Sequence, residues 1–280
     1  MTVLGSSLPS FGYPFVEIAL QGTRSLKMNA DGYLHLILRR ETVPISGPSS
    51  PASLAMSAML PILQRWAGVH LANVMPSGSY AKGTAILTGT DVDLFISLKT
   101  SATQSLRDIY ENLFKFVEAE GYAPKRQNVS INIKIGQFDV DLVPARRQDT
   151  FSSDHSLYRR RVDSWTKTNV QKHIAYVKGA NRLAETRVLK LWRNQKKLDF
   201  PSFYLEMAVI AALRYEPGRQ LSKNVATVLE FLRDSFPTER FVDPSNTANI
   251  ISDDLTDSER RAVRDAAALS LTQNWQGLVK

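Results

Sequence analysis

Cysteine is absent from the sequence, and only four histidines occur among its 280 residues. Disulfide bonds are therefore excluded, and so are zinc sites that depend on cysteine ligands. Long apolar runs are also missing, because no stretch reaches the length of a membrane-spanning helix. Met1 to Pro9 lack the basic start and apolar core of a secretory signal. These absences favour a cytoplasmic protein without a membrane partner.

Positive charge is in excess and is unevenly distributed. The chain carries 35 Lys and Arg against 27 Asp and Glu, which gives a net charge of +8. Between Arg146 and Lys197 there are fourteen Lys and Arg and only four Asp and Glu, so this segment alone has a surplus of ten. A local surplus is typical of a surface that handles the phosphates of nucleotides or nucleic acid, although a charged face also serves solubility.

Hydrophobic patterning predicts an α+β fold with two lobes. In the first lobe, residues 1–160, strands are expected at 33–39, 69–75, 91–98, 129–135 and 138–143, and helices at 51–68 and 104–120. Ser50 is the expected N-cap and Pro51 the first position of the earlier helix. The second lobe, residues 161–280, is expected to be helical at 171–197, 202–215, 222–236 and 258–271, with an irregular connection at 237–254. We therefore expect a mixed sheet with flanking helices followed by a helical lobe that completes a cleft.

An acidic pair lies on the predicted strand at 91–98. Asp91 and Asp93 are two residues apart and therefore project from one face, while the apolar residues between and after them face the other way. Two carboxylates so placed repel each other unless a cation lies between them, and Mg²⁺ prefers such hard oxygen ligands. Asp141, on a neighbouring predicted strand, is the candidate third ligand of a site for two metal ions, and Asp139 on the same face is its rival.

A glycine-serine turn precedes the acidic pair. Gly78 lets the backbone approach an anion closely, and Ser79 adds a hydroxyl group. Either motif alone is commonly an ordinary turn or a solvated strand face. Together they form the arrangement that a metal-bound triphosphate requires.

These motifs resemble a known family. GSYAKGTAILTGTDVDLFISL is similar to the glycine-serine and paired-aspartate signature of the DNA-polymerase-β-like nucleotidyltransferases, and FDVDLVPAR resembles their third-aspartate strand. The residues around Asp141 resemble the corresponding segment in the branch that contains oligoadenylate synthases, cyclic GMP-AMP synthase and the bacterial cyclic-oligonucleotide synthases. The resemblance extends over about Pro51 to Ala268. It implies a polymerase-β-like core and the metal-binding role for Asp141; the zinc-binding insertion of the animal enzyme is missing.

The resemblance also assigns roles in the helical lobe. VLKLW matches the long family helix whose lysine touches the triphosphate, which implies that role for Lys190. In FPSFYLE, Ser202 would contact phosphates and Phe203 would stack on a base, although Phe203 could equally be a core residue. The segment Trp165 to Asn169 with His173 also resembles the bacterial enzymes, without an assigned chemistry, and the segment from Asp243 to Asn249 resembles a structural ending.

The reaction that this resemblance implies is attack of a ribose hydroxyl on the α-phosphate of a nucleoside triphosphate, with release of pyrophosphate. The cofactors would be two Mg²⁺ or Mn²⁺ ions, and the partners would be nucleoside triphosphates, without a need for nucleic acid and with room for a regulatory protein. The favoured function is synthesis of a cyclic oligonucleotide second messenger in antiphage signalling. The alternatives are an RNA or tRNA 3′-terminal nucleotidyltransferase, which would use the basic segment as an RNA path, and a binding protein with a degenerate site.

Overall fold

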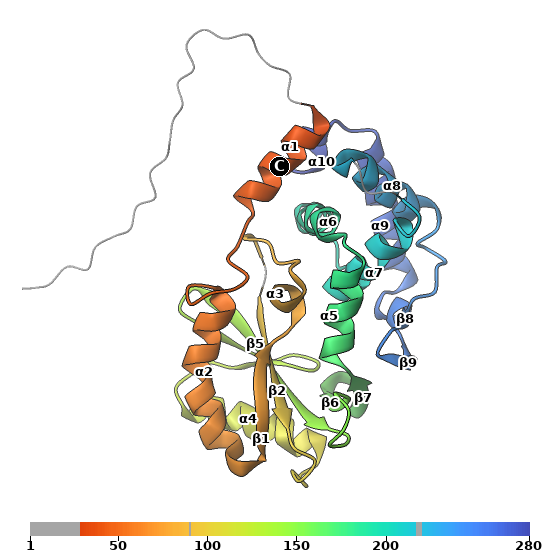
Figure 1. The fold of residues 1–280 in the computed structure, drawn as a ribbon. Helices are drawn as coiled ribbons and strands as arrows, with labels where there is room; N and C mark the ends of the chain where they lie inside the picture. Colours follow the sequence, from red (N-terminus) through yellow and green to blue (C-terminus); the bar gives the residue numbers. More distant parts are fainter. Residues whose placement is uncertain (1–28, 90, 217–219) are drawn as a thin grey trace, which may run out of the picture.

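The computed structural model describes residues 29–89, 91–216 and 220–280 (Figure 1). The chain forms a sheet with helices on one side of it and a separate group of helices beyond the other side. No helix within these ranges is long and apolar enough to cross a membrane.

The sheet is mixed, as expected. Its main path runs in the order β1-β2-β5-β4-β3, and β6 and β7 extend it from β5. The strands span Leu71–Pro76 (β1), Val92–Leu98 (β2), Lys125–Arg126 (β3), Ile131–Ile135 (β4), Phe138–Arg147 (β5), His155–Arg159 (β6) and Ser164–Thr168 (β7). Among the strands that the structure describes in this sheet, β2 and β5 pair in parallel and the other pairs are antiparallel.

Two helices cover one face of the sheet, α2 (Pro51–Ala67) and α4 (Leu106–Ala119). The side chain of Ser50 accepts a hydrogen bond from the backbone N–H of Ser53, and Pro51 is the first residue of α2, which confirms the predicted helix start. Alternate residues of the central strands, among them Val92, Leu94 and Ile96, are buried against these helices. The residues between them therefore face the opposite side, where the helical lobe lies.

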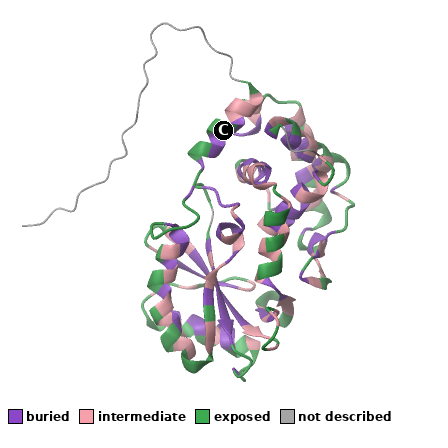
Figure 2. Ribbon diagram, in the orientation of Figure 1, coloured by how far each residue is buried: buried purple, intermediate pink, exposed green. Residues whose placement is uncertain are grey.

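The helical lobe encloses its own hydrophobic core, to which α1, α6, α7, α8, α9 and α10 contribute. The helices span Ala30–Arg40 (α1), Val170–Gly179 (α5), Leu183–Gln195 (α6), Ser202–Ala212 (α7), Leu221–Asp234 (α8), Asp257–Leu271 (α9) and Trp275–Leu278 (α10). Buried residues are concentrated in the strands of the sheet and on α6 (Figure 2).

The strand expected at residues 33–39 is wrong, because this segment lies in α1. Leu34, Ile37 and Leu38 are buried on one side of that helix, whereas Leu36 is 44% exposed. The nearly continuous apolar run conceals the helical period, and the helix start is capped by Asn29, whose Oδ1 accepts from the Gly32 N–H at 2.8 Å.

Other boundaries also differ from the expectation. The helix expected at 171–197 is two helices, α5 and α6, separated by a turn at Asn181 with φ of 54°. The connection at 237–254 contains a hairpin of β8 (Val242–Asp243) and β9 (Asn246–Ile250), and β6 and β7 were not anticipated. The division between residues 1–160 and 161–280 stays a prediction; α1 packs in the helical core, and β6 and β7 pair across the expected boundary.

Candidate active site

The turn between β1 and β2 is built around Gly78. Its φ is +53°, and a Cβ atom there would lie 1.7 Å from Oδ2 of Asp93. The backbone N–H of Ser77 donates a hydrogen bond of 2.8 Å to the carbonyl oxygen of Asp93. The short helix α3 (Gly78–Lys82) then leads away and ends at Gly83, whose φ is +79°. Glycine is therefore required at position 78 because the turn lies directly against the carboxylate of Asp93.

Asp93 and Asp141 are neighbours across the parallel pair of strands. They are register partners on β2 and β5, and both side chains face away from α2 and α4. Asp91 lies just before the first residue of β2 and is exposed. Asp141 is held by Asn132, whose Nδ2 donates to Oδ1 at 2.9 Å, and by Ser130, whose Oγ donates to Oδ2 at 3.4 Å. The sheet thus fixes two of the three predicted carboxylates side by side.

Asp139, the rival third carboxylate, points to a different partner. Its Oδ2 forms an ion pair with Lys134 at 3.3 Å at a well-exposed position. It does not line the cavity that Asp91, Asp93 and Asp141 share. The placement therefore favours Asp141 for the predicted role.

The three aspartates destabilise one another in their ionised forms. Burial, followed by the charge of Asp141, raises the pKa of Asp93 to about 7. Burial is also the main cause that raises the pKa of Asp141. Asp91 is exposed as a residue, but its carboxyl group is partly enclosed, and this enclosure, followed by the charge of Asp139, raises the pKa of Asp91. A cation in this position would relieve both the burial cost and the repulsion.

The carboxylates fit a magnesium site that is completed by substrate. Among the described residues, no three His, Cys, Asp or Glu side chains are close enough to enclose an ion on their own. Mg²⁺ is commonly held by one or two carboxylates together with substrate phosphates and water, so an incomplete protein shell suits it.

All eight residues predicted for the site line one cavity of about 360 Å³. The lining comprises Gly78, Ser79, Asp91, Asp93, Asp141, Lys190, Ser202 and Phe203, together with Lys82, Gly89 and Arg193. The sheet supplies the acidic wall, α3 supplies the glycine turn, and α6 and α7 supply the basic and aromatic wall. The cavity therefore lies between the two lobes, with negative and positive walls facing each other.

Lys190 is buried, since the residue is only 1% exposed. Its Nζ donates to Ser79 Oγ at 2.7 Å, to Thr84 Oγ1 at 2.9 Å and to Glu206 Oε1 at 2.8 Å. These contacts tie α6 of the helical lobe to the glycine-serine turn of the sheet lobe.

Sequence reasoning missed Lys82, Arg193 and Glu206. Lys82 lies inside the predicted turn motif, and its Nζ forms an ion pair with Glu206 at 2.5 Å. Arg193 donates to Ser202 Oγ at 2.9 Å from the cavity wall. The sequence does point to Glu206, because it is the single charged residue of the mainly apolar helix α7. A carboxylate buried with that helix requires cationic partners.

A second cavity, also about 360 Å³, adjoins the first and shares Gly78, Lys82, Asp93 and Phe203 with it. Thr168 and His173 line it, although neither received a role from the sequence. The rings of His173 and Phe203 lie with their centroids 4.4 Å apart. Phe203 also packs against the helical core, so it is partly a core residue while it lines both cavities, and its stacking on a base stays a prediction.

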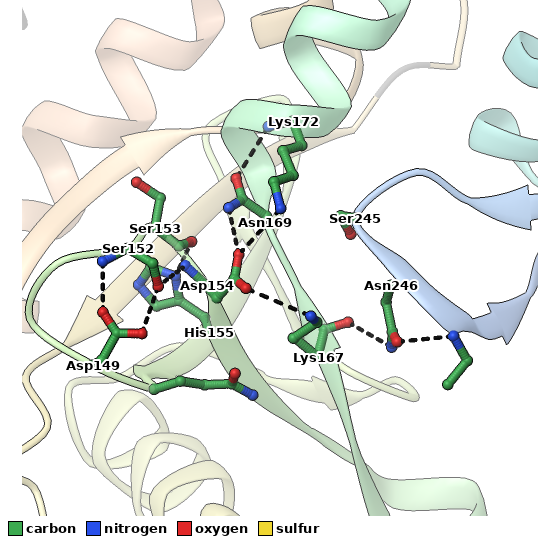
Figure 3. Close-up of polar contacts among 12 residues, drawn as sticks. Asp149, Ser152, Ser153, Asp154, His155, Lys167, Asn169, Lys172, Ser245 and Asn246 are labelled. Atoms are coloured by element: carbon green, nitrogen blue, oxygen red, sulfur yellow. Dashed lines mark hydrogen bonds and ion pairs between the residues drawn. The ribbon is translucent and has the colours of Figure 1, made fainter.

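A polar network surrounds Lys167, which lines the second cavity (Figure 3). Asn169 Nδ2 donates to Asp154 Oδ1 at 2.6 Å, while Asn169 Oδ1 caps the start of α5 by accepting from the Lys172 N–H. Asn246 of β9 donates to the carbonyl oxygen of Lys167 on β7 at 3.2 Å. The hairpin of the helical lobe is thereby bound to the edge of the sheet.

Comparison with known proteins agrees with this geometry. Residues 61–181 match the family model of the Second Messenger Oligonucleotide or Dinucleotide Synthetase domain. A cyclic AMP-AMP-AMP synthase from Escherichia coli (strain MS 115-1) is 25% identical over 237 residues, which are 70% of this chain and 74% of the relative.

Solved structures share the fold. The E. coli MS115-1 CdnC:HORMA-deltaN complex matches with a TM-score of 0.70 at 19% identity, over 87% of this chain and 92% of the other. Bradyrhizobium diazoefficiens CdnG in complex with GTP matches with a TM-score of 0.67 at 13% identity, over 86% and 90%. These findings confirm the predicted α+β fold and do not favour the RNA-tailing alternative. The match of residues 61–181 to the Second Messenger Oligonucleotide or Dinucleotide Synthetase model, together with these relatives, confirms the predicted relationship to the bacterial cyclic-oligonucleotide synthase branch of the nucleotidyltransferases.

Proposed function

We propose that this protein joins nucleoside triphosphates into a cyclic oligonucleotide second messenger and releases pyrophosphate, as part of antiphage signalling. The observation that supports it most is the single cavity in which three aspartates face two lysines and an arginine. A triphosphate carries negative charge for the basic wall, and its metal ions carry positive charge for the acidic wall.

Each predicted residue has a role in this proposal. Asp91, Asp93 and Asp141 would hold two Mg²⁺ or Mn²⁺ ions, which would acidify the attacking ribose hydroxyl and stabilise the leaving pyrophosphate when bound. Gly78 and Ser79 would hold the phosphates with Lys190, and Ser202 would contact them from α7. Phe203 would stack on a base at the boundary between the two cavities.

Two adjoining cavities suit a reaction between two nucleotides. The cavity lined by the aspartates would take the nucleotide whose α-phosphate is attacked, and the second cavity would take the nucleotide that supplies the hydroxyl. Because Asp93 lines both, the attacking and attacked atoms would meet at its carboxylate. Ring closure would repeat the same step after the linear product has reversed its orientation in the two cavities.

A regulatory protein partner belongs to the proposal as well. The E. coli structure with the same fold was solved as a complex with HORMA-deltaN. We propose only that a protein partner controls this enzyme.

The test is incubation of the purified protein with the four nucleoside triphosphates and Mg²⁺ or Mn²⁺, without RNA, followed by phosphatase treatment and mass spectrometry. We expect a phosphatase-resistant cyclic product, and no product from Asp93→Asn. Nucleotide addition that occurs only when RNA is present would contradict the proposal. Binding of nucleotides without release of pyrophosphate, with and without candidate protein partners, would support the degenerate binding protein instead.

A further inference from the structure

A buried carboxylate lies between two lysines behind the wall of the aspartate cavity. Glu206 on α7 is 0% exposed and lines neither of the two cavities described above. Its Oε2 accepts from Lys82 Nζ at 2.5 Å, and its Oε1 accepts from Lys190 Nζ at 2.8 Å and from Thr84 Oγ1 at 2.6 Å. One carboxylate therefore connects α7 to α3, to the loop after it and to α6.

We propose that Glu206 is a positioning residue for the triphosphate, because its carboxylate is the shared counter-ion that holds the ammonium groups of Lys82 and Lys190 in place at the cavity wall. The inference rests on the proposed function and deepens it, since nucleoside triphosphates are the ligands concerned.

Glu206 also determines which hydrogen-bond donors face the ligand. Lys190 has three N–H bonds, and its three acceptors are Glu206, Thr84 and Ser79. Since Ser79 Oγ accepts from Lys190, the serine O–H is directed elsewhere and is available to a phosphate oxygen. Lys190 thus acts through its fixed charge and through the orientation of Ser79.

Lys82 presents its donors more directly. Among the described residues, its Nζ makes a hydrogen bond only with Glu206, and it lies 4.9 Å from the centroid of the Phe203 ring. Lys82 lines both cavities, so its remaining N–H bonds can reach a ligand in either. Without Glu206, only the contact with the Phe203 ring would hold this flexible side chain at the wall.

Burial makes the charge of Lys190 sensitive to its counter-ion. The charged groups that face it are Glu206 of α7, Lys82 of α3, Arg193 of α6 and Asp93 of β2. Burial lowers the pKa of Lys190 to about 8, and the carboxylate of Glu206 is the main influence that opposes this shift. Phosphate binding requires the protonated lysine, so affinity is lost as the pH rises through this pKa. Removal of the Glu206 charge moves that loss to lower pH.

The experiment compares Glu206→Gln with a matched control, Glu185→Gln. Glu185 is also buried and lies on α6, where it interacts with Arg182 at 3.6 Å and Asn224 at 2.7 Å, and it lines neither cavity. The Kd of a non-hydrolysable ATP analogue with Mg²⁺ is measured between about pH 6 and pH 9.5, together with kcat and KM for pyrophosphate release. For Glu206→Gln we expect an alkaline midpoint lower by about one unit, so that affinity at pH 8 is about fivefold below that of the wild type and the two proteins bind equally near pH 6. Glu185→Gln should keep the wild-type midpoint.

A loss that is the same at every pH, or equal midpoints in the two variants, would overturn the inference. Glu206→Asp keeps the charge but retracts it by one methylene, so we expect weaker binding with a nearly unchanged midpoint. If Glu206→Gln fails to fold, the pH dependence of wild-type affinity still tests the inference. An affinity that stays constant from about pH 7 to 9.5 would refute the role of the buried Lys190. A wild type that binds nucleotide with this pH dependence but forms no cyclic product would overturn the proposed function and leave this inference standing.

Discussion

Replacement of Gly78 by alanine should separate folding from catalysis. The added Cβ atom would lie 1.7 Å from Asp93 Oδ2 and 2.5 Å from its carboxyl carbon. Both distances are far below van der Waals contact, so the Asp93 side chain has to move by an ångström or more. The backbone also has a φ of +53°, which costs an alanine about 1–2 kcal/mol.

The two effects have different magnitudes in different assays. The backbone cost lowers the free energy of unfolding by about 1–2 kcal/mol and the Tm by a few degrees. Displacement of a reacting group by about 1 Å lowers turnover about 100-fold. Pyrophosphate release and thermal unfolding, measured on the same preparation, would report both.

Gly121→Ala is the matched control. Gly121 has a φ of +91° at the end of α4, and nothing lies within 4 Å of a Cβ atom there. This variant should share the stability loss and keep its turnover. If Gly78→Ala is as active as Gly121→Ala, the placement of the glycine turn against Asp93 is refuted.

Three further changes test the site and the core. Asp141→Asn should lower turnover at least 100-fold, whereas Asp139→Asn should leave it within about twofold, because only Asp141 lines the cavity; equal losses would restore Asp139 as the rival. Asp93→Asn should raise the Tm of the metal-free protein at pH 8 while it abolishes turnover. The pKa of Asp93 is raised to about 7 in the folded protein, from 3.8 in the unfolded chain, so its contribution to stability is complete below pH 3.8 and is lost as the pH rises through 7. The increase in Tm caused by Asp93→Asn should therefore be smaller at pH 5 than at pH 8, and an equal increase at pH 5 would contradict the reasoning. Ser270→Ala should cost about 1–3 kcal/mol in unfolding without a change in turnover, because Trp192 Nε1 donates to Ser270 Oγ at 2.8 Å in a buried position; an unchanged Tm would show that the indole N–H finds another acceptor.

The elements that carry the site were predictable because their signals are local. Ser50 and Pro51 mark the start of α2 within a few residues, and the alternation of aspartates with apolar residues on β2 reports directly which side is buried. The glycine turn lies close to Asp91 and Asp93 in the sequence, so these motifs could be interpreted together before any tertiary contact was known.

The remaining features depend on contacts between distant segments. Leu34, Ile37 and Leu38 form a helical face only because α6 and α8 are present to cover it. Two of the three partners of Glu206 are Lys82 and Thr84, which precede it by more than 120 residues. A charge in an apolar helix shows that a partner exists, but the identity of that partner depends on the tertiary fold.

The position of α1 has a consequence for the order in which the protein folds. The hydroxyl of Tyr33 on α1 donates to the carbonyl oxygen of Val279 at 2.8 Å, a contact between residues 246 positions apart. Because α1 is synthesised early, its apolar face stays uncovered until α6, α8 and α10 have emerged from the ribosome. The sheet lobe has no such dependence, since its strands and helices arise in one continuous stretch. We therefore expect nascent chains to hold a folded sheet and an unassembled helical core late in synthesis, with α1 exposed to chaperones during that interval.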